Sequence, residues 1–377
     1  MNILIIGGSG ILSTDFTRRC LDAGHAVYMV NRGKRTAFID NRATLIIADW
    51  RNECEEQLKE KLECYRFDVV IDFLTFNVEQ LKKTLRIVKD KFQQYIFISS
   101  ATAYKDVDDG VMITEDMHIG NEKWSYADNK SKCEKYLEQT DVCYTIIRPY
   151  VTFGDSRIPF QIIPDGYQFT LLARIIEEKP ILLYNQGEAI CTLTSTRDFA
   201  EALFGILLNS KAYKEAFHIT SNNVQTWNEV YMEICRLLNK PSYPISMTQS
   251  DVHRYFPEFE SILNGDKGRN MIFDNSKILA TVGEDVFQTN LRTGMEASIK
   301  YYFEHEYMQG IDYKWDGKCD YFLRKQRRIK MHHLKEYCKE KSNSKLYYYF
   351  MTITPLRIIY DGVRSMKRIL HNGGRNG

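Results

Sequence analysis

Tyr126 and Lys130 stand four residues apart in a short polar segment, and a strand-like run upstream of them ends in Ser99-Ser100. Residues four apart lie on the same face of a helix. An ordinary tyrosine has a pKa of about 10 and is a poor base at neutral pH, but a neighbouring ammonium favours the phenolate. Tyr126, Lys130 and Ser100 together could therefore take a proton from a hydroxyl group. The spacing alone is weak evidence, because a half-exposed tyrosine and a solvated lysine would produce it too.

The amino-terminal residues carry a second feature of chemical interest. Residues 2–6 are an uninterrupted apolar run, and Gly7-Gly8-Ser9-Gly10-Ile11-Leu12-Ser13 follows directly. A helical pattern then ends near Gly24, and residues 25–30 have the composition of a strand. Strand, glycine turn, helix and strand in this order are typical of a dinucleotide site, where the helix N-terminus faces the pyrophosphate. Ser13 occupies the place of the usual third glycine, and we expect it to loosen the packing of helix against strand slightly.

The end of the second predicted strand bears on the choice of nucleotide. Chains that bind NAD usually place Asp or Glu there to hold the ribose 2′-hydroxyl, whereas this chain has Asn31-Arg32. A guanidinium pairs with a 2′-phosphate through two parallel hydrogen bonds, and a carboxylate would repel that phosphate. We therefore expect NADP(H) in preference to NAD(H). A solvated basic loop, with NAD held through Asn31, stays open as the alternative.

Composition limits the class of protein. A chain of 377 residues suits two domains, or one elaborated α/β domain with an extension. The formal net charge of +2 requires no acidic partner. The nine cysteines are odd in number and contain no Cys-x-x-Cys pair, which argues against disulfides and a zinc site. His332-His333 has no nearby cysteine or carboxylate pair, so we expect no metal.

The sequence also bears on location. No apolar run reaches the about 20 residues of a membrane-spanning helix. A strand begins at residue 2 and no signal peptide is visible. We therefore expect a cytoplasmic protein, with association at the inner face of the membrane left open.

Strand and helix patterns alternate through the first 150 residues. Strand-like runs occupy residues 2–6, 25–30, 44–48, 68–73, 94–99 and 143–149. This alternation predicts an α/β fold, a Rossmann-like doubly wound parallel sheet with helices on both faces. The carboxyl ends of parallel strands share one edge, and ligands bind there. We expect the residues that follow strand ends to converge at that edge: the glycine turn, Asp49, Phe73-Leu74, Ser99-Ser100 and Arg148-Pro149.

Five motifs in this order resemble the extended short-chain dehydrogenases/reductases, within them the NAD(P)-dependent epimerase/dehydratase family that modifies nucleotide sugars. They are Gly7 to Gly10, Asp49 in Ala48-Asp49-Trp50-Arg51-Asn52, Ser99 to Tyr104, Tyr126 with Lys130, and Arg148 to Gly154. The resemblance covers about residues 1–305.

The resemblance implies a role for each matching residue. Tyr126 is the acid/base, Ser100 holds the reacting hydroxyl with Thr102 beside it, and Lys130 grips the nicotinamide ribose. Asp49 contacts the adenine. The cofactor is held further by Gly7, Gly8, Ser9, Gly10, Ile11, Leu12, Asn31, Arg32, Trp50, Phe73, Leu74, Ser99 and Pro149.

The residues after Ser100 bear on the reaction. Removal of water needs a general acid for the leaving hydroxyl, and the sugar dehydratases of this family carry an acidic residue directly after the catalytic Ser or Thr. Ala101 and Thr102 cannot supply that proton, and the segment resembles that of sugar 4-epimerases. We therefore expect a nucleotide-sugar epimerase that transiently oxidises the sugar C4 hydroxyl, with Tyr126 taking the proton.

Two alternatives stay open. Net reduction commonly uses NADPH, so an NADPH-dependent reductase of a keto-sugar nucleotide is the first. The second belongs to another class: a non-catalytic NADP sensor or an RNA-associated protein on the same fold. Such proteins usually lack the Tyr/Lys pair, and the chain carries no recognisable nucleic-acid-binding module, so we expect no nucleic-acid partner.

We divide the chain into three parts. Residues 1–152, completed by parts of 190–220, form the dinucleotide-binding domain; 153–312 form a smaller α/β substrate-binding region; 313–377 form a basic aromatic extension. Trp124 and Tyr150 could stack on a substrate ring, although aromatic residues more often pack in the core or in loops. Arg157 could pair with a diphosphate, and a surface arginine explains it equally well. We expect Thr196 to cap a helix and His218 to lie in the core.

The extension differs in charge from the rest of the chain. Residues 318–377 contain fifteen Lys/Arg and four Asp/Glu, a net charge of +11, whereas residues 1–317 carry −9. Leu356, Ile359, Val363 and Met366 alternate with arginines and lysines. Such a segment can lie on an anionic membrane, dock on a partner enzyme or join two subunits of a homodimer. A helical extension with solvated charges explains the composition equally well.

Overall fold

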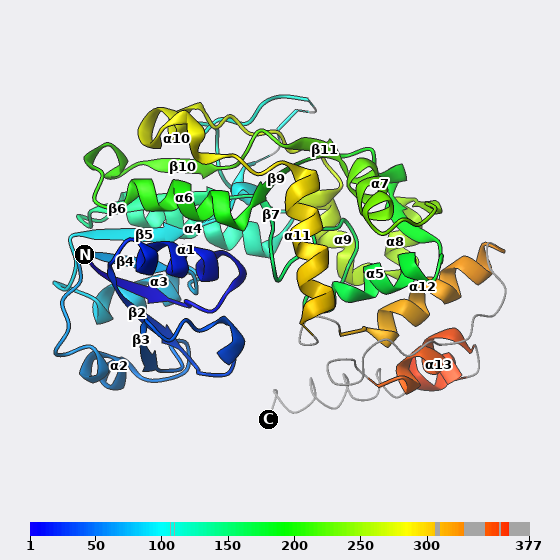
Figure 1. The fold of residues 1–377 in the computed structure, drawn as a ribbon, viewed down its shortest axis with the longest axis horizontal. Helices are drawn as coiled ribbons and strands as arrows, with labels where there is room; N and C mark the ends of the chain where they lie inside the picture. Colours follow the sequence, from blue (N-terminus) through cyan, green and yellow to red (C-terminus); the bar gives the residue numbers. More distant parts are fainter. Residues whose placement is uncertain (106, 109, 306–309, 328–343, 354–355, 362–377) are drawn as a thin grey trace. The chain divides into compact units, whose positions relative to one another are not determined.

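The computed structural model describes residues 1–105, 107–108, 110–305, 310–327, 344–353 and 356–361 (Figure 1). Much of the predicted extension, His332-His333 included, lies outside these residues. The chain divides into two compact units. The first unit comprises Met1–Pro159, Ala189–Thr226 and Ser261–Ala297, and the second comprises Phe160–Glu188, Trp227–Glu260 and the described part of Ser298–Gly377. Domain boundaries after residues 152 and 312 stay a prediction.

A parallel sheet forms the centre of the first unit. Among the described residues it has seven strands in the order β10-β6-β5-β4-β1-β2-β3, with every neighbouring pair parallel. The chain winds outward from β1 in one direction and then from β4 in the other, which places a ligand crevice at the carboxyl ends of these two strands. The predicted Rossmann-like sheet is confirmed. The strands are β1 Asn2–Ile6, β2 Ala26–Asn31, β3 Thr44–Ile47, β4 Val69–Asp72, β5 Gln94–Ile98, β6 Tyr144–Pro149 and β10 Ala216–Ile219.

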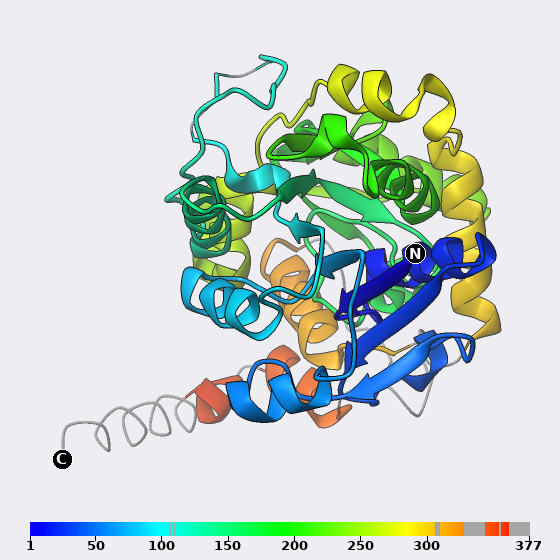
Figure 2. The ribbon, with the colours of Figure 1, turned by 90° about the vertical axis from the view of Figure 1, so that its left-hand side faces the viewer.

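Helices cover both faces of this sheet, because its strands are apolar on both sides (Figure 2). Ile3 and Ile5 of β1 pack with α1 and α6 on one face, and Leu4 and Ile6 pack with the helices of the other face. The first face carries α1 Ile11–Asp22, α6 Thr196–Ile206 and α10 Ser276–Val282. The second carries α2 Glu55–Lys61, α3 Val78–Ile87 and α4 Ser125–Glu138.

The cap of α6 differs from the prediction. Ser195 precedes the helix, and its hydroxyl accepts a hydrogen bond from the backbone N–H of Arg197. Thr196 is the first helical residue, and its hydroxyl donates to Asp15 on α1 instead. The first unit also contains a small sheet and several short helices: β7 Val151–Phe153, β9 Ile190–Ser195, β11 Val224–Thr226, η1 Thr36–Phe38, η2 Ala101–Ala103, η4 Ser210–Ala212, the π-helix η6 Leu263–Lys267 and η7 Glu284–Val286.

The second unit is mostly helical, with β8 Ile181–Tyr184 and β12 Pro244–Met247 paired in parallel. Its helices are α5 Phe169–Ile176, α7 Trp227–Leu237, α8 Gln249–Tyr255, α12 Tyr313–Lys325 and α13 Leu346–Thr352, with η3 Asn185–Gly187 and η5 Pro257–Phe259. Two helices, α9 Glu260–Ile262 and α11 Leu291–Glu304, begin in one unit and end in the other. Within the described ranges, none of the helices has the length and apolar character needed to span a membrane.

Candidate active site

The glycine turn between β1 and α1 is a tight backbone cradle. Gly7 has a φ of +95°, and a Cβ there would lie 2.8 Å from the Leu74 side chain, so glycine is required on both counts. The buried hydroxyl of Ser13 accepts from the Gly10 N–H at 2.8 Å and donates to the Gly7 carbonyl at 2.9 Å. Ser13 therefore braces the turn, and the expected loosening of packing is not seen.

The residues around this turn fit a dinucleotide. Gly10 is the N-cap of α1 and offers no side chain to its first turn, so the first N–H groups remain suited to phosphate oxygens. At the end of β2, the buried Asn31 accepts from the Gly33 N–H at 2.8 Å. In the described part of the chain, its Nδ2 has no hydrogen-bond partner. This orphaned donor lies at the strand end where a cofactor ribose would be held.

Arg32 and Asp49 lie at neighbouring strand ends. Arg32 is exposed, and hydrogen bonds from Asn52 chiefly, with the charge of Arg32 as a smaller contribution, lower the pKa of Asp49. A cation is therefore present beside the carboxyl ends of β2 and β3. Trp50 follows Asp49 but lies in the core, where its indole N–H donates to Thr84 Oγ1 at 2.9 Å.

Tyr126, Ser100 and Thr102 come together as the sequence predicts. Tyr126 lies in the first turn of α4 and is partly buried, and its interaction with the Ser100 hydroxyl acts to lower the pKa of the phenol. The hydroxyls of Ser100 and Thr102 share a hydrogen bond of 2.8 Å. The Trp124 ring lies 4.8 Å from the Tyr126 ring, which fixes the phenol from the side.

Lys130 is fully enclosed beneath Tyr126. Its Nζ donates at 2.6 Å to the carbonyls of both Thr75 and Ile98 and lies 5.9 Å from the centre of the Tyr126 ring. Burial lowers the pKa of Lys130 to about 8. The expected lowering of the Tyr126 pKa is not seen: burial raises that pKa, and the hydrogen bond from Ser100 opposes the rise. The physical reason is that burial disfavours the charged phenolate, and this outweighs the contributions that lower the pKa.

Asp266 is a residue of this site that sequence reasoning missed. It lies on the π-helical turn η6, is 3% exposed, and accepts a 2.6 Å hydrogen bond from the Tyr150 hydroxyl. Burial raises the pKa of Asp266 to about 6, and its charge contributes to the raised pKa of Tyr126. The Arg157 charge acts on Asp266 and Tyr126 alike, lowering the pKa of each. Asp266 is far from Tyr126 in sequence, and a π-helical turn has no simple sequence pattern that would reveal it.

Asn121 fixes the π-helical turn against the segment that follows β5. Its Nδ2 donates at 2.8 Å to the carbonyl of Thr102 and at 2.8 Å to that of Gly265. A Cβ on Gly265 would lie 2.8 Å from the Cβ of Trp124, so the turn approaches closely there. The turn that carries Asp266 is thus held against Asn121 and Trp124 by two independent contacts of Gly265.

A buried polar chain supports the end of β5. Glu134 accepts hydrogen bonds from the Ser99 hydroxyl and from Arg148, whose Nη2 lies 2.6 Å away. Arg148 donates to the Tyr104 hydroxyl at 2.6 Å, and that hydroxyl lies 2.5 Å from His218 Nε2. His218 Nδ1 faces a backbone carbonyl at 2.8 Å, so Nδ1 carries the proton and Tyr104 donates to Nε2. Burial lowers the pKa of His218 to about 4, so it is a neutral core residue, as predicted.

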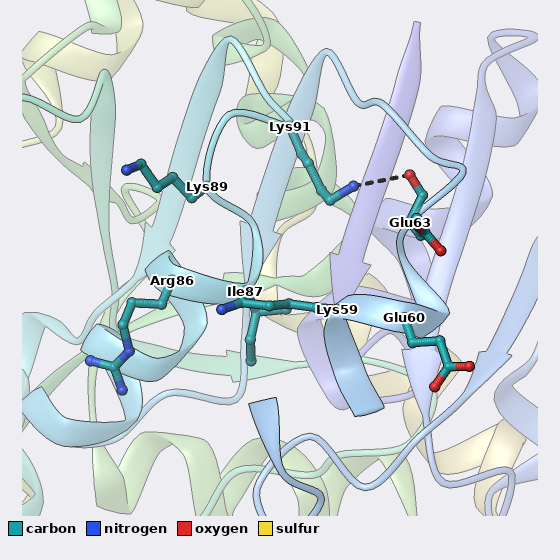
Figure 3. Close-up of a pocket in the computed structure, with 7 residues that line it drawn as sticks. All are labelled: Lys59, Glu60, Glu63, Arg86, Ile87, Lys89 and Lys91. Carbon is teal, nitrogen blue, oxygen red and sulfur yellow. Dashed lines mark hydrogen bonds between the residues drawn. The ribbon is translucent and has the colours of Figure 1, made fainter. Parts of the chain in front are cut away.

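A shallow hollow of about 400 Å³ lies elsewhere on the first unit (Figure 3). Lys91 donates to the Glu63 carbonyl there at 3.2 Å. Because Lys91 precedes β5, the hollow is at the sheet edge opposite Ser99, away from the predicted site. Its lining residues are Lys59, Glu60, Glu63, Arg86, Ile87, Lys89 and Lys91. In the ranges that the structure covers, no group of His, Cys, Asp or Glu is arranged to hold a metal ion.

Comparison with known families settles the membership of this chain. The model of the NAD dependent epimerase/dehydratase family matches residues 3–220, more than half of the chain. The chain belongs to this family. The match spans the glycine turn, the Tyr126–Lys130 pair and the strand that ends at Pro149.

A curated protein is similar to this chain in amino-acid sequence. The chloroplast stem-loop binding protein of 41 kDa b from Arabidopsis thaliana is 27% identical over 237 residues. The alignment covers 60% of this chain and 60% of the relative's own length.

Solved structures share the fold of the epimerase/dehydratase family with this chain. UDP-glucose 4-epimerase of Thermotoga maritima, solved with UDP-glucose, has a TM-score of 0.66 at 18% identity and covers 81% of this chain and 99% of its own. UDP-glucuronic acid 4-epimerase from Bacillus cereus with NAD scores 0.64 at 17% identity, covering 80% and 96%. dTDP-glucose 4,6-dehydratase from Bacillus anthracis with NAD scores 0.65 at 17% identity, covering 81% and 97%.

Proposed function

We propose that the chain is a nucleotide-sugar epimerase that works by transient oxidation of the sugar C4 hydroxyl. The observation that carries the proposal is the convergence of Tyr126, in the first turn of α4, with the Ser100–Thr102 hydroxyl pair that directly follows β5. That edge also carries the Gly7 cradle and the orphaned Asn31 amide. Family membership and the epimerase folds of the solved relatives support this reading.

The chain's own residues divide the work. Tyr126 takes the proton of the substrate hydroxyl, and Ser100 with Thr102 hydrogen-bonds the oxygen as it becomes a carbonyl. Lys130 holds the ends of β4 and β5 through two carbonyls, and its Nζ lies 5.9 Å from the centre of the Tyr126 ring. A nicotinamide dinucleotide, held by Gly7 to Leu12, Asn31, Arg32 and Asp49, supplies reversible hydride acceptance when bound.

Within this proposal we favour NADP over NAD. Arg32 is exposed at the end of β2, where a 2′-phosphate would lie, and no carboxylate takes the place of Asn31. The solved relatives named above with NAD bound share only the fold with this chain, at 17% identity.

Mass spectrometry and proton NMR of the purified protein with a panel of nucleotide sugars test the reaction. An isomer of unchanged mass supports the epimerase. A gain of two mass units with consumption of NADPH supports the keto-sugar reductase instead. A loss of eighteen mass units means a dehydratase and would assign the missing general acid to a residue outside the Ala101-Thr102 segment.

A second candidate function is association with RNA stem-loops. The observation that favours it is the 27% identity to the chloroplast stem-loop binding protein. Electrophoretic mobility of a stem-loop RNA, with a single-stranded RNA of the same composition as control, tests it. If the unaltered chain and the Tyr126→Phe variant both retard the stem-loop RNA and not the single-stranded RNA, RNA binding does not depend on the proposed catalytic residue.

A further inference from the structure

The described part of the predicted extension packs into the second unit. Arg174 on α5 is fully buried and pairs with Asp316 and Asp320 of α12, the latter at 2.9 Å. Lys179 joins both carboxylates at 3.2 and 3.3 Å. The Tyr348 hydroxyl of α13 donates to Asp320 at 2.8 Å. This ionic cluster secures α12 and α13 to the body of the unit, so the described extension is not a loose appendage.

Helix α13 buries only one of its faces. Tyr348 and Met351 pack against α12, where a Cβ on Gly317 would lie 2.9 Å from the Tyr348 carbonyl. Leu346, by contrast, is exposed, and Tyr349 is exposed beside it. The outer face of α13 is therefore apolar and aromatic.

The segment 356–361 packs beside α13 and α12. Its Tyr360 stacks on Phe350 with ring centres 5.9 Å apart, and Arg357 lies 4.1 Å from the ring centre of Tyr321 on α12. With those two side chains turned inward, Ile358 is 68% exposed and Ile359 58% exposed. Exposing two adjacent isoleucine side chains to water is unfavourable in free energy, and burying them against a partner would be favourable.

We propose that Leu346, Tyr349, Ile353, Ile358 and Ile359, here called the C-terminal apolar face, dock on an anionic phospholipid surface. The apolar side chains would enter the boundary between headgroups and acyl chains, and tyrosines suit that boundary. Charge complementarity identifies the partner: residues 318–377 carry +11 while the rest of the chain carries −9. Basic residues near an anionic leaflet are attracted to it.

The sequence beyond Ile359 has the same character. Ile359, Val363, Met366 and Leu370 recur at the spacing of one helical face, and arginines and lysines stand between them. An RNA partner would use the basic residues but has no need of exposed isoleucines. Two copies joined through this face would bring two equally basic segments together, which repel each other.

Sedimentation with lipid vesicles tests the proposal. The full-length protein is mixed with vesicles of phosphatidylcholine, with or without phosphatidylserine, and the bound fraction is measured at low and high salt. The double variant Ile358→Ser with Ile359→Ser removes the two most exposed isoleucines. Ile47→Ser is the matched control, because Ile47 is 62% exposed on β3 in the first unit.

We expect the unaltered protein and Ile47→Ser to sediment with phosphatidylserine vesicles, and less at high salt. The double variant should bind at least tenfold more weakly with its circular dichroism unchanged. Equal binding to both kinds of vesicle, or undiminished binding by the double variant, overturns the proposal. A homodimer or an RNA complex that the double variant abolishes, without vesicle binding by the unaltered protein, assigns the face to another partner and overturns it too.

Discussion

Nζ of Lys130 donates a 2.6 Å hydrogen bond to the carbonyl oxygen of Ile98, the residue directly before Ser99 and Ser100. The same ammonium donates to the carbonyl of Thr75 after β4. Lys130 therefore holds the backbone directly before Ser99 and Ser100, and its Nζ lies 5.9 Å from the centre of the Tyr126 ring. Substituting Lys130 would leave two buried carbonyls unpaired, which costs folding free energy. Tyr126 is the cleaner position at which to test the chemistry.

Tyr126→Phe removes the phenolic oxygen and keeps the ring that packs against Trp124. We expect turnover of the accepted nucleotide sugar to fall roughly a hundredfold to ten-thousandfold, with cofactor binding retained. Tyr136→Phe, on the same helix, is the control. Near-normal turnover by Tyr126→Phe would remove Tyr126 as the base.

Asp266→Asn removes a negative charge that raises the pKa of Tyr126. Tyr126 should then ionise more easily, so the low-pH limb of kcat/KM moves to lower pH. Asp198→Asn is the control. Burial also raises the pKa of Asp198, but this carboxylate accepts a hydrogen bond from the Thr289 N–H and does not contribute to the pKa of Tyr126. If the pH profile of kcat/KM is the same for Asp266→Asn and the unaltered protein, Asp266 does not influence the ionisation of Tyr126.

The same substitution should change stability with a definite sign. Between the ordinary pKa of 3.8 and about 6, the folded chain keeps the Asp266 proton that the unfolded chain has lost. Burial of Asp266 therefore lowers the free energy of unfolding progressively as pH rises through this window. Relative to the unaltered protein, Asp266→Asn should gain stability from about pH 4 to about pH 7, measured by urea unfolding. A constant difference across that range would contradict the raised pKa.

Gly7→Ala tests the close approach of the turn to β4. Gly7 and Gly24 both have positive φ, but only at Gly7 does an added Cβ meet a neighbour, the Leu74 side chain. Gly24→Ala should lower the free energy of unfolding by about 1 kcal/mol. Gly7→Ala should lower it by more and weaken binding of the dinucleotide, followed by calorimetric titration. Equal effects of the two substitutions would mean that the Leu74 side chain moves aside at little cost in free energy.

Arg32→Ala tests the preference for NADP. Loss of a bidentate phosphate contact should weaken NADPH binding by about tenfold or more and leave NADH binding nearly unchanged. Lys34→Ala provides a control for loss of charge in the same loop. Equal weakening of the two nucleotides would place Arg32 away from the 2′-phosphate. Quenching of protein fluorescence on titration gives both affinities.

Arg174→Met tests the ionic cluster that secures α12. Removing one partner leaves Asp316 and Asp320 buried with less compensation, which should lower the free energy of unfolding by roughly 3–5 kcal/mol. Arg86→Met, which breaks an exposed pair with Glu55, should have little effect. Urea unfolding compares the two. A small effect of Arg174→Met would mean that Lys179 alone neutralises the cluster.

The sequence by itself determined the features that depend on neighbouring residues. Apolar runs with a glycine turn specify β1 and α1, because backbone freedom and strand burial are local properties. The spacing of Tyr126 and Lys130 specifies one helical face, and alternation of strands with helices specifies a parallel sheet. Its shared carboxyl edge then brings Ser100 to Tyr126.

Features that depend on contacts between distant parts of the sequence were decided only by the tertiary structure. It placed Asp266 beside Tyr126 and engaged the Lys130 charge with two carbonyls. It also buried the Trp50 indole in the core and turned Ser13 into a brace of the glycine turn. Burial and hydrogen-bond partners come from segments distant in sequence, and they set the pKa of a group. No pattern of neighbouring residues contains that information.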